Sequence, residues 1–387
     1  MAQSLYLFNP EHDMALANFT PYYKAPSEIR RMANDLSVLP AWYADEEDEA
    51  LVKIDSAGRV EGWESPLYPE KVAWITGWRD ADYRPWGWNP ALLHRLREAG
   101  VGEGCLLSDE RMERIRHLSG RQRCVDVLDG FRGMSFVCGQ AVVCRSVDEV
   151  KKRVSEWGTA VLKAPWSGSG RGLARVSEAQ WSPSLEGWVS RILRTQGAIM
   201  AEPFYNKVCD FAMEFRADGS GRVDFVGYSL FETDGFGNYK ANLLAADAEI
   251  ERRLSRYVPV EQLNAVRREL ERRLSLLLAA DYAGYLGVDM MICSDNGGLL
   301  IHPCVEINLR MNMGVVSHVF SVRYLHPLAT GRYVVEHYSA DGEAWAFHQQ
   351  MSRDFPLEMQ AGGIAKGYLS LTPVREDTHY QAYITVG

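Results

Sequence analysis

Short apolar and β-branched runs alternate with helix-like segments over the first third of the chain. Residues 5–8 and 72–75 are such runs, and each has the composition of a buried strand. Residues 91–96 and 108–117 follow helix-start signals, an asparagine before a proline and a serine before two acids. We therefore predict an N-terminal α/β unit over residues 1–120, within the usual size of a domain.

The next segment, residues 121–200, has the pattern of a small subdomain. A capping box at 146–149 precedes an amphipathic helix. An apolar run at 159–162 and a strand-like run at 173–176 follow, and a short loop rich in glycine and serine joins them. A further helix is expected at 185–194. The pattern predicts a two-stranded hairpin packed against helices.

The remaining residues, 201–387, combine paired strands with one long helix. Residues 211–215 and 223–231 alternate or run apolar on either side of an Asp-Gly turn, as paired strands do. Leucine and valine recur at helical spacing over 261–280, with arginines and glutamates on the opposite face. That stripe predicts a helix packed on the core.

The last sixty residues contain one helix-like and two strand-like segments. The helix-like segment is 331–338, and the strand-like segments are 368–371 and 381–386. They either close the preceding unit or form an appendage to it.

The loop between the two hairpin strands has a composition suited to holding an anion. Lys163 ends the first strand, and the loop then runs through Ser167, Gly168, Ser169, Gly170, Arg171 and Gly172. Small residues leave backbone N–H groups open to an anion, and the hydroxyls and the guanidinium add donors. An ordinary Gly/Ser turn is the alternative interpretation, because such a turn would also contain these glycines. The coincidence of a lysine, an arginine and three glycines after a strand favours a phosphate-binding lid.

Two commoner phosphate motifs are excluded by the same stretch. A P-loop needs Gly-Lys-Ser/Thr running into a helix, and no such tripeptide follows these glycines. A dinucleotide fingerprint needs Gly-x-Gly-x-x-Gly before a helix, whereas these glycines alternate and precede a strand.

A second polar cluster lies near residue 300. Two strands joined by a Gly-rich turn are expected, and alternation puts Glu306, Asn308 and Arg310 on one face. Asp289, embedded in apolar sequence, can reach that face from the neighbouring strand. Carboxylate and amide oxygens suit Mg²⁺ or Mn²⁺, and magnesium completes its shell with water and phosphate. A solvated polar face at a sheet edge is the alternative. A carboxylate buried among apolar residues would be costly without a partner, which favours the metal.

A polar loop follows the first strand of the N-terminal unit. It carries Glu11, His12 and Asp13, and loops at the carboxyl ends of strands in open α/β sheets bind ligands. A substrate contact is one interpretation. A capped turn that starts a helix at Met14 is the other.

Composition and charge exclude several classes of protein. The net charge of −9 argues against a general nucleic-acid surface. No apolar run reaches the roughly 18 residues of a membrane span, and the N-terminus lacks the features of a signal peptide. Seven cysteines without a Cys-x-x-Cys motif predict free thiols in a reducing compartment, and hence a cytoplasmic protein.

Over residues 120–320 the order and spacing of these motifs resemble those of ATP-grasp enzymes. The resemblance implies an α/β and α+β chain, in which an N-terminal Rossmann-like unit precedes a two-subdomain ATP-grasp fold. The units would be residues 1–120, a lid subdomain at 121–200, and a C-terminal subdomain with the metal site at 201–387. ATP would lie between the two ATP-grasp subdomains, with Mg²⁺ or Mn²⁺ bridging its phosphates.

The resemblance also implies a role for each matching residue of the nucleotide site. Lys163 would contact the α- and β-phosphates, and the lid from Ser167 to Gly172 would cover the triphosphate. Asp210 matches a position that often meets the ribose hydroxyls. The hinge that reads the adenine edge is matched by Glu202, Pro203, Phe204 and Tyr205.

At the metal site, Asp289, Glu306 and Asn308 match the ligands of the family. Arg310 matches an arginine that faces the transferring phosphoryl group or the substrate carboxylate. A second phosphate-binding lysine, expected upstream of the lid, is not evident. Arg121 or Arg123 would take its place.

The activity implied is Mg²⁺-dependent joining of a small-molecule carboxylate to an amine or similar nucleophile through an acyl phosphate. A small-molecule kinase on the same scaffold is one alternative, and a nucleotide-binding regulatory protein without turnover is another. Lys163 together with the metal ligands argues against the regulatory protein, which has less need of a metal. The identities of the acid and the amine, and whether the chain forms a homo-oligomer, are left open by the sequence.

Overall fold

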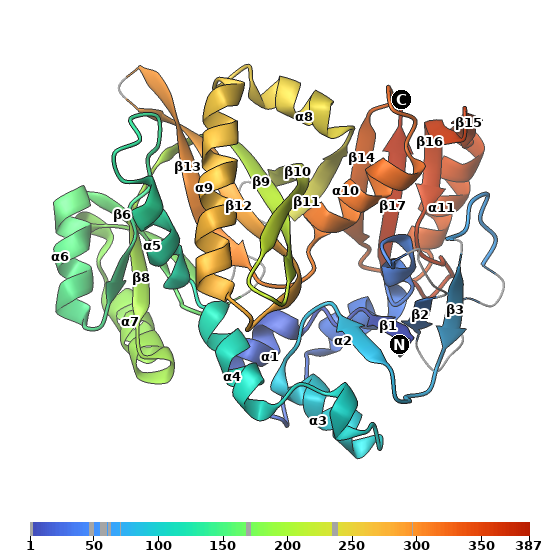
Figure 1. Ribbon diagram of the computed structural model, residues 1–387, viewed down its shortest axis with the longest axis horizontal. Helices are drawn as coiled ribbons and strands as arrows, with labels where there is room; N and C mark the ends of the chain where they lie inside the picture. Colours follow the sequence, from blue (N-terminus) through green and yellow to red (C-terminus); the bar gives the residue numbers. More distant parts are fainter. Residues whose placement is uncertain are drawn as a thin grey trace.

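Three β-sheets with helices packed against them make up the protein (Figure 1). The computed structural model describes residues 3–45, 50–54, 60, 63–69, 71–167, 172–233, 239–295 and 297–387. The mixture of parallel and antiparallel sheets confirms the predicted α/β and α+β class.

The N-terminal sheet is parallel, with the strand order β3-β2-β1-β4. Its strands are β1 (Ser4–Leu7), β2 (Ala50–Lys53), β3 (Val72–Ile75) and β4 (Asp82–Pro85). The helices of this part are α1 (His12–Asn18), α2 (Ser27–Asp35), α3 (Pro90–Glu98), α4 (Asp109–Leu118) and the short η1 (Leu39–Trp42) and η2 (Glu103–Cys105). Both helix-start predictions are confirmed, because the side chains of Asn89 and Ser108 cap α3 and α4.

The second sheet is small and antiparallel, with the order β5-β8-β6-β7. Its strands are β5 (Val142–Cys144), β6 (Thr159–Lys163), β7 (Leu173–Ser177) and β8 (Ile199–Pro203), covered by α6 (Val147–Trp157) and α7 (Pro183–Gln196). The helix α5 (Arg123–Leu128) and the short η3 (Asp129–Phe131) precede it, and η4 (Glu178–Gln180) follows β7. The predicted hairpin is confirmed, since β6 and β7 pair on either side of the Gly/Ser loop.

The third sheet is the largest, and all its neighbouring strands are antiparallel. In order across the sheet they are β13 (Gly298–Asn308), β12 (Ala283–Asp295), β9 (Asn206–Asp218), β10 (Val223–Thr233), β11 (Tyr239–Leu244), β14 (Gly331–His337), β17 (Tyr380–Val386), β16 (Gly363–Ser370) and β15 (Glu358–Gln360). The helices here are α8 (Asp247–Leu254), α9 (Val260–Leu278), α10 (Met313–Tyr324) and α11 (Glu343–Asp354). The apolar stripe of α9 packs on β9 and β10, as its sequence predicts.

One secondary-structure prediction is wrong. Residues 331–338 are not helical, because β14 occupies Gly331–His337 and pairs with both β11 and β17. The segment contains Tyr333 and two adjacent valines, residue types that fit a pleated surface, and Tyr333 is fully buried in the core. The last sixty residues therefore extend the large sheet and are not an appendage.

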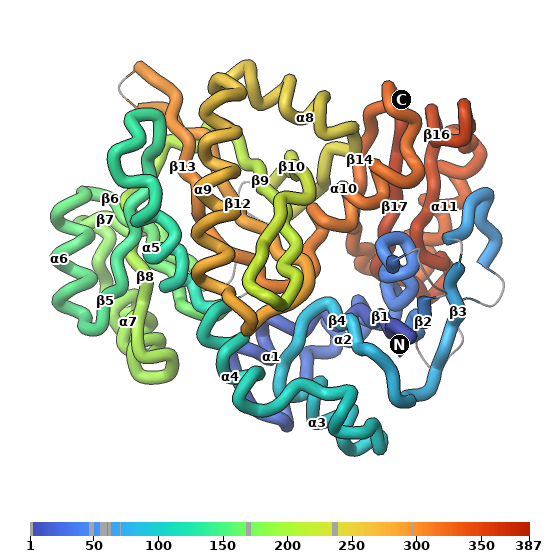
Figure 2. The backbone as a smooth tube through the Cα atoms, viewed as in Figure 1, coloured from blue at the N-terminus to red at the C-terminus, as the bar shows by residue number. Residues whose placement is uncertain are grey.

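The N-terminal part and the C-terminal strands share one hydrophobic core. The core combines Leu36, Leu39 and Trp42 with Leu371, Ala382 and Ile384, and Figure 2 shows the blue strands β1 and β2 next to the red strand β17. The buried Trp42 donates from Nε1 to the carbonyl of Leu371 at 2.7 Å, and the Asp35 carboxylate accepts from the backbone of His379 and Tyr380. These contacts fix α2 and η1 of the N-terminal part against the β16–β17 end of the large sheet.

Candidate functional site

Lys163 connects the small sheet to the large one. It ends β6 and is buried, and its Nζ lies 2.6 Å from Glu202 Oε2 on β8. The same Nζ donates to the carbonyl of Val305 on β13 at 3.2 Å. Burial raises the pKa of Glu202, although the neighbouring Lys163 ammonium opposes the shift. The predicted phosphate lysine thus lies between the two sheets, already paired with a carboxylate.

The structure describes the residues on either side of the predicted lid, up to Ser167 and from Gly172 onward. Ala164 donates from its N–H to the carbonyl of Gly172 at 2.8 Å, which continues the hairpin beyond β6 and β7. Gly172 has a φ of 73°, and a Cβ there would lie 2.8 Å from the Ser167 side chain, so only glycine fits. The predicted anion-binding residues Gly168, Ser169, Gly170 and Arg171 lie outside the described residues.

Arg121 joins this lid root to the acidic strand. Its guanidinium donates to the Ser167 hydroxyl, to the Ser167 carbonyl at 3.1 Å and to the Ala164 carbonyl at 2.9 Å. It also donates to Glu306 Oε1 at 2.7 Å. Burial would lower the pKa of Arg121, but the Glu306 carboxylate outweighs it and the pKa is raised. Of the two arginines considered from sequence, Arg121 lies at this site, whereas Arg123 pairs with Asp126 on α5.

The predicted metal ligands meet on β12 and β13. Asp289 and Glu306 are cross-strand partners, and Gly287 faces Asn308 in the same register. The pKa of Asp289 is raised to about 7, mainly by burial and then by the Glu306 carboxylate, while a hydrogen bond with Asn308 opposes the shift. Two carboxylates in low dielectric repel one another, so a cation between them would relieve the repulsion.

The donor set is compatible with magnesium. Within the described ranges, no group of three His, Cys, Asp or Glu side chains could hold a metal ion. At this site Asp289 and Glu306 supply two carboxylates, and the third donor side chain is the amide of Asn308. Such a set suits an ion that takes much of its coordination shell from water and phosphate.

Arg310 is held by a residue from the far end of the chain. Its Nε and Nη2 donate to the two carboxylate oxygens of Asp13 at 2.8 and 2.7 Å. Burial would lower the pKa of Arg310, but the Asp13 carboxylate outweighs burial and the pKa is raised. Burial would in turn raise the pKa of Asp13, but the Arg310 guanidinium outweighs burial and the pKa is lowered. The polar loop after β1 therefore contributes directly to the site.

The other residues of that loop have different roles. The helix α1 begins at His12 and not at Met14, and no side chain caps it. Glu11 accepts from Arg95 on α3 at 2.7 Å, away from the acidic strands. His12 and Asp13 line a small pocket, and Ser167, Glu306, Asn308 and Arg310 line the same pocket.

The predicted adenine and ribose residues lie on β8 and β9. Phe204 follows β8 and is partly exposed, and the Arg175 guanidinium stacks on its ring, 3.6 Å from the centroid. Asp210 accepts from Lys207 and from Thr233 Oγ1. Its charge also contributes to the raised pKa of Asp289, so Asp210 lies on the metal-site side of the sheet.

Glu214 is a buried acid at this site that sequence reasoning missed. It lies on β9 and accepts from Asn312 Nδ2 at 2.9 Å. Burial raises its pKa to about 8, and the hydrogen bond from Asn312 opposes the shift. The available signal was its position inside an apolar strand, the same signal that marked Asp289.

Comparisons with known proteins identify the fold. No family model and no curated protein matches the chain. Biotin carboxylase from Campylobacter jejuni, solved as a β,γ-ATP complex, matches all of this chain and 88% of its own, with a TM-score of 0.52 and 12% identity. The biotin carboxylase domain of 2-oxoglutarate carboxylase from Hydrogenobacter thermophilus, solved with MgADP and bicarbonate, matches 100% of this chain and 86% of its own, with a TM-score of 0.52 and 13% identity. Both are ATP-grasp proteins, and this chain has the ATP-grasp fold.

Proposed function

We propose that this protein is an ATP-dependent ligase that joins a small-molecule carboxylate to an amine through an acyl phosphate. The observation that carries the proposal is the Arg121 guanidinium, which binds Ser167 at the lid root and Glu306 on the acidic strand together. A nucleotide between the lid and that strand would have its phosphates against both. The fold and the nucleotides bound by the two carboxylases support the same conclusion.

Asp289, Glu306 and Asn308 are the residues that would hold Mg²⁺, which would neutralise charge on the phosphates. Their chemistry supports this assignment, because burial and the facing Glu306 carboxylate both disfavour the ionised form of Asp289, which a bound cation would favour. Of the two nearby arginines, Arg121 already compensates Glu306 and Arg310 already binds Asp13.

The protein's own residues would supply positive charge to the reacting groups and would keep water away from them. Lys163 and Arg121 would contact phosphate oxygens as charge builds on the transferring group, and Arg310 would orient the acid. If Lys163 turned from Glu202 to phosphate, the raised pKa of Glu202 would favour its protonation. Closure of the lid over the root at Ser167 would protect an acyl phosphate from hydrolysis.

The test is an ADP-release assay guided by thermal shift. The protein is first screened with Mg²⁺-ATP and pooled amino acids, peptides and small carboxylates, and the acids and amines that raise the melting temperature are carried forward. We expect ADP and phosphate to form only when an acid and an amine are both present. A phosphorylated product without an amine would indicate a kinase, and stabilisation by ATP without ADP under any condition would indicate a regulatory protein.

Two neighbouring arginines provide matched variants for this assay. Arg121→Lys keeps a charge beside Glu306 but loses the fork that also reaches Ser167, so turnover should fall by one to three orders of magnitude. Arg123→Lys changes an arginine two positions away, whose ion pair among the described residues is with Asp126, and should leave turnover within about twofold. Equal turnover in the two variants would remove the observation on which the proposal rests.

A further inference from the structure

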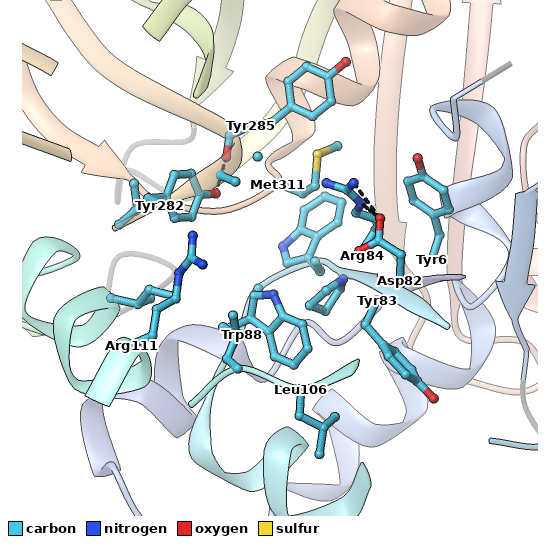
Figure 3. A pocket seen from close by; sticks show the side chains of 18 of the residues that line it. Tyr6, Asp82, Tyr83, Arg84, Trp88, Leu106, Arg111, Tyr282, Tyr285 and Met311 are labelled. Carbon is cyan, nitrogen blue, oxygen red and sulfur yellow. Dashed lines mark hydrogen bonds and ion pairs between the residues drawn. The ribbon is translucent and has the colours of Figure 1, made fainter. Parts of the chain in front are cut away.

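A second hollow lies behind the acidic strand, between the N-terminal sheet and the large sheet. Its volume is about 440 Å³, within the range of small-molecule sites. It is lined by β4, the turn around Gly104, α4 and the start of β12 (Figure 3). Leu309 lines both this hollow, which we call the β4 cavity, and the pocket that holds Asn308 and Arg310. The two sites are therefore neighbours, separated by one stretch of backbone.

Aromatic side chains line the β4 cavity from both sides of the interface. Trp88 comes from the N-terminal side and Tyr282 from the large-sheet side, and Met311 lies to the right of Tyr282 and above Trp88 in Figure 3. The backbone N–H of Met311 donates to the carbonyl of Trp86 at 2.9 Å, which fixes this wall to the N-terminal sheet. Aromatic and thioether surfaces of this kind favour a planar apolar group as the occupant.

Most of the charges around the β4 cavity are compensated. Arg84 pairs with Asp82 at 2.6 Å, and Arg216 lies 3.6 Å from Asp45. The third acid, Asp281, is bound through its carboxylate by Arg114 at 2.9 Å. The carboxylates of the cavity therefore have their cations.

Arg111 is the exception. Its Nε donates to the carbonyl of Asp281 and its Nη2 to the carbonyl of Ala280, both at 3.3 Å. Both acceptors are neutral, and within the described ranges no carboxylate lies at ion-pair distance from this guanidinium. Figure 3 shows the Arg111 side chain extending toward Tyr282 across the cavity from Arg84. A guanidinium without a counter-charge in an aromatic cavity suits an anion with planar acceptor oxygens.

We propose that the β4 cavity binds a small carboxylic acid that carries an aromatic ring. The ring lies between Trp88 and Met311, and the carboxylate accepts from Arg111. This site is outside the nucleotide pocket, and its occupancy does not depend on the proposed ligase activity. The acid is either a substrate of the reaction or an effector, and the shared chemistry is the aromatic carboxylate.

Three small probes test the chemistry on the full-length protein without nucleotide. Hydrocinnamate has both the ring and the carboxylate, hydrocinnamyl alcohol has only the ring, and propionate has only the carboxylate. In a ligand-observed NMR titration we expect hydrocinnamate to bind with a dissociation constant of about a millimolar or below, from its size. The other two should bind at least about tenfold more weakly. Equal binding of acid and alcohol, or no binding of the acid at millimolar concentration, would overturn the proposal.

Variants locate the binding on the protein. Arg111→Gln should weaken hydrocinnamate at least about tenfold, because a hydrogen bond to a charged group is lost. The matched control is Arg95→Gln, which removes the same charge on α3 at a residue that pairs with Glu11 and does not line the cavity, and which should stay within about twofold. Gly104→Leu adds bulk at a position where a Cβ meets open space, so it should block the cavity in a folded protein. Unchanged affinity in Gly104→Leu would refute the location even if Arg111→Gln failed to fold.

A final experiment distinguishes an acid that is a substrate from an acid that is an effector. With Mg²⁺-ATP and an amine pool, ADP release that requires hydrocinnamate marks a substrate, whereas a changed rate on another acid marks an effector. Either result supports the site. Failure of the ligase assay with intact binding would leave the site standing and reject the proposed function alone.

Discussion

The buried pair formed by Lys163 and Glu202 allows a quantitative test of the nucleotide site. Their side chains are only 8% and 6% exposed, and 2.6 Å separates the charged atoms. Lys163→Met leaves the Glu202 carboxylate without a cation and removes the donor to the Val305 carbonyl. Loss of one partner of a buried pair costs about 3–5 kcal/mol, whereas an apolar replacement of both partners is often close to neutral.

The structure therefore predicts strong coupling between the two positions. Lys163→Met and Glu202→Met should each destabilise the protein by about 3 kcal/mol or more, but the double variant by about 2 kcal/mol or less. Additive effects would instead give about 6 kcal/mol or more. Lys163→Met should also depend on pH. Without its cation the pKa of Glu202 rises further than in the wild type, so the loss of stability relative to the wild type grows as the pH rises above the already raised wild-type pKa and is small below it.

Urea unfolding of the four proteins, followed by far-ultraviolet circular dichroism at pH 5 and pH 8, measures both effects. The matched control is Lys152→Met, which breaks an exposed pair with Glu156 and should cost about 0.5 kcal/mol or less. Additive single effects, or a Lys163→Met penalty that is the same at both pH values, would show that the two charges do not compensate each other.

Three further predictions concern the metal-site side. Asp13→Asn removes the carboxylate of buried Arg310 and should lower the free energy of unfolding by about 3 kcal/mol, measured by urea unfolding; a loss below about 1 kcal/mol would contradict the pairing. Because burial raises the pKa of Glu214 from 4.5 to about 8, the wild type should lose stability as the pH rises from 4.5 to 8. Glu214→Gln has no group that titrates there. Its free energy of unfolding should therefore equal that of the wild type below pH 4.5 and exceed it by several kcal/mol at pH 9, which melting temperatures measured across this pH range would test. Without Mg²⁺, ATP should raise the melting temperature much less than Mg²⁺-ATP, because Glu306 keeps Arg121 and repels the phosphates; equal shifts would contradict this.

Local patterns in the sequence predicted the elements that local chemistry determines. Alternation or helical spacing within short segments predicts the hairpin of β6 and β7, the apolar stripe of α9 and the adjacency of Asp289 and Glu306. The segment 331–338 was mistaken for a helix, because its place between β11 and β17 is decided by strands distant in sequence.

The partners of the site cations could not be predicted in the same way. Asp13 is 297 residues away from Arg310, and Arg121 is 185 residues away from Glu306. No periodicity connects positions so far apart, since the pairing depends on how the three sheets are packed. Sequence reasoning could therefore name a lysine and two arginines as phosphate ligands without indicating that each already has a carboxylate partner.

These pairings bear on where a metal would bind. Lys163, Arg121 and Arg310 each face one carboxylate, from Glu202, Glu306 and Asp13. In the part of the chain that the structure describes, Asp289 forms no ion pair, and burial together with the charges of Glu306 and Asp210 favours its protonated form, against the charge of Arg310. Among the described residues of this site, positive charge is therefore lacking beside Asp289. A divalent cation there would compensate both acids and weaken the hold of Glu306 on Arg121, which frees a guanidinium for phosphate. The electrostatics of the ligand-free protein thus favour joint binding of metal and nucleotide over binding of either alone.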